Sequence, residues 1–271
     1  MNARMLVIPT LAEPTAIPRS SHVRLAHSSR SLRPPRPRPR RDGAVGEGVV
    51  RRYLDAGADV VVPTRSQERA DEFRALLGPA ATERLHLVVH DYTSFAGADD
   101  LAVQMVANLG GIDDVVAPIG GWWAGRRLWE IDESDWSTAF VGLATAHMAV
   151  ARAVIPRLTP GGSYAVVVGA SASWPVPTSG LVSMEQAAVL MMQQVLVAEL
   201  EGANRAFALV LGPVSTRVVA GEPGWVTADQ VGLVAVGVSA DASIDGRSIR
   251  MSEPTEIADA LALVGAAEPA S

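Results

Sequence analysis

The chain has 271 residues, of which 48% are hydrophobic and 19% are charged, and its formal net charge is −6. This composition is that of a globular chain with enough apolar material for one large core. The acidic balance gives no support to nucleic-acid binding, and the absence of cysteine excludes disulfides and thiolate metal sites. No uninterrupted apolar run approaches the roughly 20 residues of a membrane span. We therefore expect a cytoplasmic protein with neither a membrane segment nor a metal site.

The first 42 residues differ in kind from the rest. They are rich in arginine, poor in acids, and end in the alternation Arg36-Pro37-Arg38-Pro39-Arg40. Such a segment buries too little apolar surface to fold alone, so we place residues 1–42 outside the folded domain. Three interpretations stay open: a disordered basic tail, a targeting peptide, or in part a shifted reading frame. The last is considered because Pro and Arg codons read one base later encode Leu, Val, Ala and Gly, the residues of a first strand before a glycine turn.

From residue 43 to 271 helices and strands alternate. We expect helices over 47–56, 67–77, 99–109, 133–158 and 182–200, and strands over 59–64, 85–89, 114–119, 164–168 and 206–211. Near-continuous Val/Leu/Ala strands separated by helices predict a single α/β domain, a doubly wound parallel sheet with helices on both faces. Ligands of such sheets lie at the carboxyl ends of the strands.

A glycine-rich turn opens this domain. Gly43, Gly46 and Gly48 lead directly into the first helix. Small residues there let backbone amides approach a pyrophosphate, which the helix N-terminus also attracts. The alternative is an ordinary glycine-rich capping turn. The motif thus makes these three glycines candidate cofactor-binding residues.

Residues further along agree with one known family in spacing and type. The pattern Gly46-x-Gly48, the run 57–62, Thr64-Arg65 and His90-Asp91-Tyr92 resembles the short-chain dehydrogenase/reductase family, which has a Rossmann-like fold. The resemblance implies that Arg65 meets the 2′-phosphate of NADP and that Asp91, with Tyr92 beside it, lies at the adenine. Thr64 stands where an acid would favour NAD, so NADP is expected and NAD is less favoured. The alternative for Arg65 is a solvated surface charge.

The resemblance extends to about Met251. Gly212-Pro213-Val214-Ser215-Thr216 resembles the segment that holds the nicotinamide carboxamide, which implies that Gly212 and Thr216 contact the cofactor. Gly120 is the one match to the turn after the fourth strand. Residues 245–250 resemble the closing strand.

The departures from the family gather at its chemistry. The positions of its asparagine, serine, tyrosine and lysine hold Leu143, Gly169, Val182 and Gln186, and the chain contains no lysine. Its first strand is missing or atypical here. Because valine cannot donate a proton as the tyrosine does, we assign no catalytic residue. Other polar or aromatic side chains near the expected pocket each also have an ordinary structural interpretation: Ser171, Ser173, Trp122, Trp123, Arg126, Arg127, His147 and Glu185.

The two long helices, 133–158 and 182–200, are apolar nearly all round, although a helix on a sheet needs only one apolar side. We therefore expect a homo-oligomer, a dimer or tetramer. Three functions stay open: an NADP-dependent oxidoreductase acting on a small-molecule carbonyl or alcohol with a non-standard proton donor, an enzyme of another class such as a cyclase or isomerase, and a non-catalytic NADP-binding partner.

Overall fold

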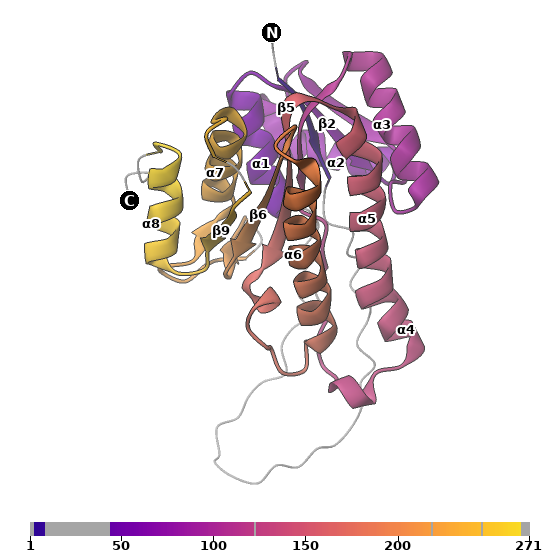
Figure 1. The fold of residues 1–271 in the computed structure, drawn as a ribbon, viewed down its shortest axis with the longest axis vertical. Coiled ribbons are helices and arrows are strands. Elements are labelled where there is room, and N and C mark those ends of the chain that lie inside the picture. Colours follow the sequence, from indigo (N-terminus) through magenta and orange to yellow (C-terminus); the bar gives the residue numbers. More distant parts are fainter. Residues whose placement is uncertain (1–2, 9–43, 122, 218, 245, 267–271) are drawn as a thin grey trace.

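The computed structural model describes residues 3–8, 44–121, 123–217, 219–244 and 246–266 (Figure 1). Seven strands form one sheet in the order β3-β2-β1-β4-β5-β6-β9, and every neighbouring pair is parallel. This confirms the predicted doubly wound α/β fold. The strands are β1 (Arg4–Val7), β2 (Asp59–Thr64), β3 (Leu85–Val89), β4 (Ile112–Ala117), β5 (Leu158–Gly169), β6 (Arg205–Leu211) and β9 (Ser248–Met251).

Helices cover both faces of the sheet (Figure 1). One apolar core lies between the sheet and α1 (Ala44–Asp55), α2 (Gln67–Leu77), α7 (Ala228–Ala240) and α8 (Pro254–Leu263). A second core lies on the opposite face, under α3 (Phe95–Leu109), α5 (Leu143–Val154) and α6 (Gly180–Leu200). The short helix α4 (Glu133–Trp136) and a π-helical turn, Ser137–Gly142, lead into α5. Strands β7 (Val214–Ser215) and β8 (Val226–Thr227) pair beside the main sheet.

The first strand is present, so the expectation that it is missing is wrong. Arg4–Val7 occupies the centre of the sheet, paired with β2 on one side and β4 on the other. The apolar run from Met5 to Ile8 is fully buried. The free energy gained by burying these four side chains explains why β1 belongs to the sheet although the sequence that follows it is rich in arginine. The boundary at residue 42 is corrected accordingly, since β1 belongs to the domain. The interpretations of residues 9–43 lie outside the described part of the chain.

A bidentate ion pair fastens β1 in place. The Arg4 guanidinium donates to both carboxylate oxygens of Asp113, at 2.9 and 2.7 Å, and the Arg4 amide donates to the same group at 2.7 Å. Thr159 Oγ1 donates to Asp113 as well. Gly111 leaves the room that the guanidinium fills, since a Cβ there would lie 2.8 Å from it. The central strand is thus held by a specific charge pair as well as by its backbone ladder.

The amino ends of β4, β5 and β6 hold a second buried polar group. Ser163 Oγ donates to Asp114 at 2.6 Å, and Ser239 links Ser163 to the hydroxyl of Tyr53. Burial raises the pKa of Asp114 to about 6. Beside this group, the Arg205 guanidinium donates to carbonyl oxygens at the end of α7 and in the adjoining turns: Gly161, Val238, Ser239, Asp241 and Ile244.

The sequence-predicted elements are placed correctly, with shifted ends. Helix α3 begins four residues before the predicted Asp99, because Ser94 Oγ caps it by accepting the Gly97 amide. The long helix predicted over 133–158 is divided by the π-helical turn. Helices α7 and α8 were not predicted. The closing strand lies at Ser248–Met251, slightly later than the predicted 245–250.

Two helical stretches, Glu133–Arg157 and Gly180–Leu200, are long and apolar enough to cross a membrane by length and composition alone. The expectation that nothing in the chain approaches such a span is therefore wrong on that criterion. In this fold both stretches lie against the sheet, and their inward side chains form the second core. Their apolar character thus has a structural explanation within the domain.

Candidate functional site

The carboxyl ends of β1 and β4 mark the point where the strand order reverses. From β1 the chain continues to β2 and β3 on one side, and from β4 it continues to β5 and β6 on the other. Crevices at such switch points bind ligands in open α/β sheets. The predicted cofactor-binding residues outside the glycine helix follow the carboxyl ends of β2, β3, β4 and β6.

Helix α1 begins at Ala44, three residues before the predicted start at 47, so Gly46 and Gly48 lie within the helix and not in a turn before it. The two glycines serve different purposes. Gly46 is buried in the first turn of the helix. A Cβ on Gly48 would overlap the carbonyl of Ala228, and one on Gly232 would lie 2.5 Å from the carbonyl of Gly48. Gly48 therefore permits the close packing of α1 on α7. Gly43 lies outside the described residues.

An ion pair joins the glycine helix to the segment after β6. Arg217 Nε lies 2.9 Å from Glu47, which also pairs with Arg51. Next to Arg217, Thr216 Oγ1 accepts the amide of Val219 at 3.1 Å, so its hydroxyl proton stays available for donation. The structure thus brings the predicted pyrophosphate and nicotinamide segments together.

Gly212 lies at the end of β6, where a Cβ would stand 2.6 Å from the Ser252 carbonyl. It therefore permits close contact between the backbones of two neighbouring segments. Gly120, after β4, has no atom of the described residues within 4 Å of the position of a Cβ. Of these two glycines, only Gly120 faces open space in the direction where its side chain would stand.

The predicted adenosine end lies beyond β2 and β3. Arg65 and Asp91 are both exposed there. The hydroxyl and amide of Thr93 donate to the Asp91 carboxylate, and with the charge of Arg65 they hold the pKa of Asp91 below its usual value. Arg65 and Asp91 are thus close enough to interact electrostatically. Tyr92 differs from expectation: its side chain is 2% exposed and packs in the second core, so only its backbone is left to face a ligand.

The positions that depart from the family meet in space. Gln186 Oε1 accepts the amide of Gly169, which ties α6 to the end of β5. Leu143 and Val182 are buried and apolar. Ser171 Oγ lies 3.3 Å from the point where a Cβ on Gly169 would stand. A serine hydroxyl therefore lies close to the place of the family's own serine, although it comes from a residue two positions later.

A buried polar pair lies behind these residues, and the sequence reasoning gave it no role. His147 Nε2 contacts the Ile119 carbonyl at 2.9 Å and Glu185 Oε1 at 3.7 Å, and neither side chain is exposed to solvent. Gln186 Nε2 donates to the other oxygen of Glu185. Burial lowers the pKa of His147 to about 4 and raises that of Glu185 to about 7, so between these values the pair is neutral. The sequence did contain a signal for this pair, because each of the two apolar helices carries a polar residue at a position that faces inward.

The arginine pair after β4 is already engaged. Arg126 donates to Asp132 and Asp135, and Trp123 Nε1 donates to Asp135 as well. Arg127 lies over the ring of Trp129, 5.4 Å from its centroid. These contacts fix the loop to the start of α4 rather than presenting a free clamp. Trp122 lies outside the described residues.

These surroundings suit a dinucleotide at its two ends. Arg65 and Asp91 offer a cation and an acceptor where the adenosine would lie, and Gly120 leaves open space at the end of β4. Thr216 offers a hydroxyl donor for a carboxamide. The negative charge of Glu47, unfavourable beside a pyrophosphate, is balanced by Arg51 and Arg217.

Residues 41–264 match the family model described as enoyl-(acyl carrier protein) reductase. A hydroxysteroid 11-beta-dehydrogenase 1-like protein from Xenopus tropicalis is 26% identical over 136 residues, covering 49% of this chain and 46% of that protein. A short chain dehydrogenase from Pseudocercospora fijiensis is 30% identical over 195 residues, covering 69% of this chain and 61% of that protein. The chain thus spans about half the length of the first relative and less than two thirds of the second.

Solved structures share the fold. A blue fluorescent protein from a metagenomic library, in complex with NADPH, superposes with a TM-score of 0.69 at 19% identity, covering 78% of this chain and 93% of that one. A short chain dehydrogenase from Burkholderia cenocepacia in complex with NADP gives 0.68 at 19%, covering 77% and 92%. A short-chain dehydrogenase/reductase from Brucella melitensis gives 0.69 at 18%, covering 92% and 97%.

The family match begins at residue 41, just before the glycine turn, and ends in the last residues of the described fold. It spans every strand of the sheet except β1, which precedes it. The strand order, the glycine helix and this match agree. The chain belongs to the short-chain dehydrogenase/reductase family of NAD(P)-dependent oxidoreductases.

Proposed function

We propose that the protein is an NADP(H)-dependent oxidoreductase that acts on a small carbonyl compound or alcohol. The observation that carries this proposal is the meeting of the glycine helix with the Thr216 segment through the Glu47–Arg217 ion pair. Family membership supports the reaction class, and two proteins of the same fold were solved with NADPH or NADP bound. When bound, the cofactor supplies the hydride.

Arg65 sets the preference for the phosphorylated cofactor, because Thr64 leaves no acid at the end of β2 to bind the ribose hydroxyls. The test is a fluorescence titration with NADPH and with NADH. Arg65→Ala is expected to weaken NADPH binding roughly 10-fold and to leave NADH binding unchanged. Arg69→Ala, on the following helix, is the matched control. Equal loss for both cofactors contradicts the role of Arg65.

Proton delivery differs from that of the family, because Val182 replaces the tyrosine and the chain has no lysine. Ser171 donates a hydrogen bond to the substrate oxygen, and water delivers the proton. A water route costs roughly 10²- to 10⁴-fold in rate relative to a positioned acid, so slow turnover is expected. Ser171→Ala should lower kcat roughly 10-fold or more with NADPH affinity unchanged. An unchanged kcat contradicts this role.

A protein without redox activity is the second candidate, and a specific observation favours it: both Leu143 and Val182 are buried apolar side chains where the family has polar ones. The two candidates separate in one assay. The absorbance of NADPH is followed over a panel of aldehydes and ketones. Consumption of NADPH supports the oxidoreductase, whereas tight NADPH binding with no consumption supports the second candidate.

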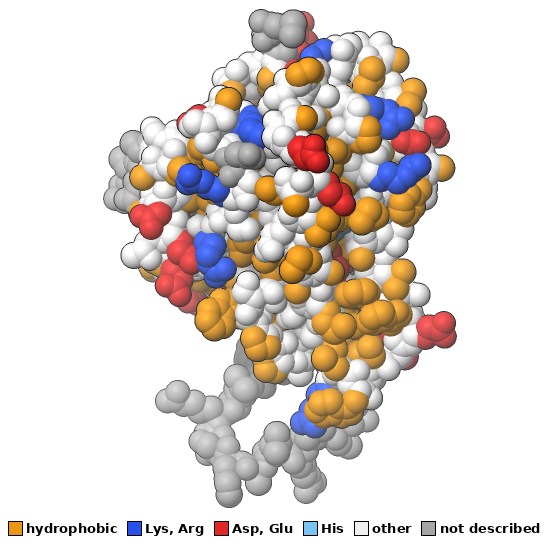
Figure 2. All heavy atoms as spheres, viewed as in Figure 1, with side chains coloured by type: hydrophobic (Ala, Val, Ile, Leu, Met, Phe, Trp, Pro, Cys, Tyr) orange, Lys and Arg blue, Asp and Glu red, His pale blue; other side chains and the backbone are white. Residues whose placement is uncertain are grey.

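A homo-oligomer belongs to the same proposal. Figure 2 shows apolar side chains gathered over the outer surfaces of α5 and α6. Large apolar side chains exposed on these helices and on the turn before α5 are Val141, Met148, Met184, Met191 and Val195. Apolar side chains gathered on one exposed face often mark an interface between protein chains. Met191→Glu, at a side chain 57% exposed, is expected to yield monomers in sedimentation, whereas a wild-type monomer at micromolar concentration contradicts the assembly.

A further inference from the structure

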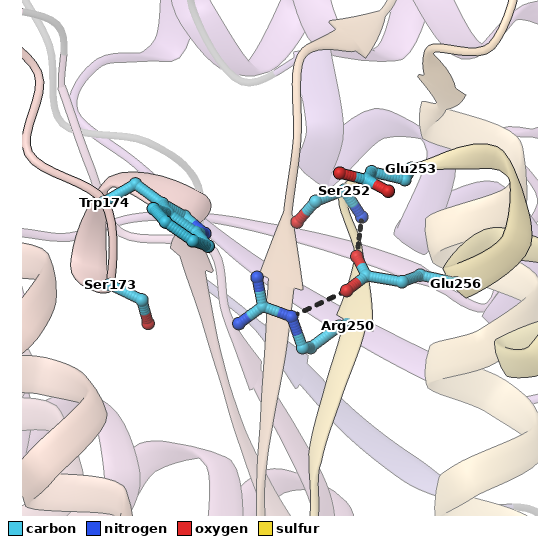
Figure 3. Close-up of a pocket in the computed structure, with 6 residues that line it drawn as sticks. All are labelled: Ser173, Trp174, Arg250, Ser252, Glu253 and Glu256. Atoms are coloured by element: carbon cyan, nitrogen blue, oxygen red, sulfur yellow. Dashed lines mark hydrogen bonds and ion pairs between the residues drawn. The ribbon is translucent and has the colours of Figure 1, made fainter.

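A pocket of about 590 Å³ lies at the open edge of the sheet, apart from the predicted dinucleotide crevice. The segment after β5 forms one wall, with Ser173 and Trp174, and β9 with the start of α8 forms the other, with Arg250, Ser252, Glu253 and Glu256 (Figure 3). No residue that we assigned to the cofactor lines it. It nevertheless adjoins the predicted nicotinamide segment, because Ser252 packs directly on Gly212.

Arg250 is held by one edge of its guanidinium, and its two terminal nitrogens have no partner among the residues that the structure describes. Its Nε donates to Glu256 Oε1 at 2.8 Å, and the other oxygen of Glu256 accepts the Ser252 amide at 2.9 Å. In Figure 3 the two terminal nitrogens turn away from Glu256, towards Trp174 and Ser173. The remaining edge of the fork therefore presents two parallel donors to the pocket. Such an edge matches a carboxylate bidentately.

The opposite wall is flat and apolar. The Trp174 side chain is 65% exposed, unusually open for an indole, and it faces the free edge of Arg250 across the pocket (Figure 3). Glu253, the other acid at the pocket, lies on the far side of Ser252 from the guanidinium. An anion is thus favoured at the Trp174 side, where a planar body can also lie against the indole.

The sheet register places the two walls of the pocket on either side of β6. Gly169, Leu211 and Met251 stand side by side on β5, β6 and β9. Two strand spacings, roughly 10 Å, separate the first of these backbone positions from the last. Trp174 follows the end of β5, and Arg250 directly precedes Met251. A flat molecule that reaches from Trp174 to Arg250 would therefore lie across the end of β6.

We infer that Arg250 and Trp174 select a substrate that carries a carboxylate and a flat apolar body beside its carbonyl or alcohol group. This inference rests on the proposed function and names its substrate class. Arg250 acts as a specificity-determining residue that binds the carboxylate, and Trp174 supports the apolar body.

The kinetic test uses a biphenyl with an aldehyde at one para position and a carboxylate at the other, compared with its methyl ester, under saturating NADPH. Arg250→Met is expected to raise KM for the acid roughly 10- to 100-fold, with kcat and the ester's KM little changed. Arg250→Lys should lose most of the same discrimination, because an ammonium lacks the fork. Trp174→Ala should raise both KM values alike. Arg247→Met, at an exposed arginine just before β9, is the control.

A binding measurement keeps the two proposals apart. Calorimetry compares biphenyl carboxylate with the corresponding carboxamide, with the wild type and Arg250→Met. Tighter binding of the carboxylate, lost in Arg250→Met and kept in Arg247→Met, supports the inference even if no aldehyde is reduced. Equal binding of acid and amide overturns it, and normal NADPH turnover of the ester in that case leaves the proposed function standing.

Discussion

At the amino ends of the strands, three charged side chains are hydrogen-bonded within the fold. Asp113 binds Arg4 of β1, Asp114 binds Ser163, and Arg205 binds carbonyl groups at the end of α7. At the carboxyl ends, three polar side chains have donor or acceptor atoms without a hydrogen bond among the described residues. The outer edge of Arg250 has no partner within the described residues, and Glu185 Oε1 and His147 Nδ1 are buried without hydrogen bonds there. These three amino-end groups stabilise the fold, whereas the three carboxyl-end groups can engage a ligand, a water or a proton.

The largest effect is expected from removing Arg205. Arg205→Met leaves several buried carbonyl groups at the end of α7 without donors, which costs about 3–5 kcal/mol of unfolding free energy. Urea denaturation measures it, with the exposed Arg247→Met as the control. A loss below about 1 kcal/mol would show that water replaces the guanidinium and that the amino end is less closed than described.

Strand β1 comes next. Arg4→Met and Asp113→Asn should each cost about 2–3 kcal/mol, and the double variant little more, because they break one interaction. The hydrogen bonds of Arg4 and Thr159, against the opposing effect of burial, lower the pKa of Asp113 to about 2. Its contribution is thus present above about pH 4 and is lost as the pH falls towards 2. Additive losses in a double-mutant cycle would contradict the pair.

Glu185 gives the corresponding prediction at the carboxyl ends. Its folded-state pKa of about 7 exceeds that of an unfolded glutamate, so its carboxyl favours folding at low pH and opposes it as the pH rises through 7. Glu185→Gln should therefore gain about 2 kcal/mol relative to wild type at pH 8.5 and little at pH 5. Glu199→Gln, exposed on the same helix, is the control. The same gain at both pH values would argue against a buried, titrating carboxyl.

Asp114 should behave alike but with a smaller effect and at a lower pH. Its pKa is raised by burial to about 6, so stability is lost as the pH rises through 6. Asp114→Asn is expected to gain about 1–2 kcal/mol at pH 8, measured by thermal unfolding beside the exposed Asp100→Asn. No gain would mean that the nearby charge of Arg205 compensates for the carboxylate.

Most of the sheet was predictable, because its strands are uniform Val/Leu/Ala runs that only a doubly covered sheet can bury. Strands β2 and β3 and helix α2 lie where the pattern placed them. Strand β1 was missed because it is only four residues long and is separated from its glycine turn by residues 8–42. Helix α7 was missed because its small and β-branched residues show little amphipathic periodicity, although its N-cap Thr227 and Gln230 form a recognisable capping box.

The candidate site was predictable only in part. Arg65, Asp91 and Thr216 could be predicted because each belongs to a short local motif that is visible in a single sequence. The arrangement of the site depends on residues far apart in the chain, such as the ion pair of Glu47 with Arg217 and the shared pocket of Trp174 and Arg250. No periodicity encodes such pairs. Tyr92 was wrongly predicted to lie at the adenine. Its position next to Asp91 in the sequence does not determine the side on which its ring packs, and the ring packs in the second core.

The position of β1 carries a consequence for how the chain reaches its native state. Its neighbours β2 and β4 are both made later, and β4 ends only at Ala117. During synthesis the first strand must wait for the 51 residues between Val7 and Asp59 before β2 can pair with it, and for more than a hundred residues before β4 completes its other side. Closing such long loops is slow, and an unpaired apolar segment invites aggregation in the interval. We therefore expect the yield of native protein to depend on how long Met5 to Ile8 stay exposed.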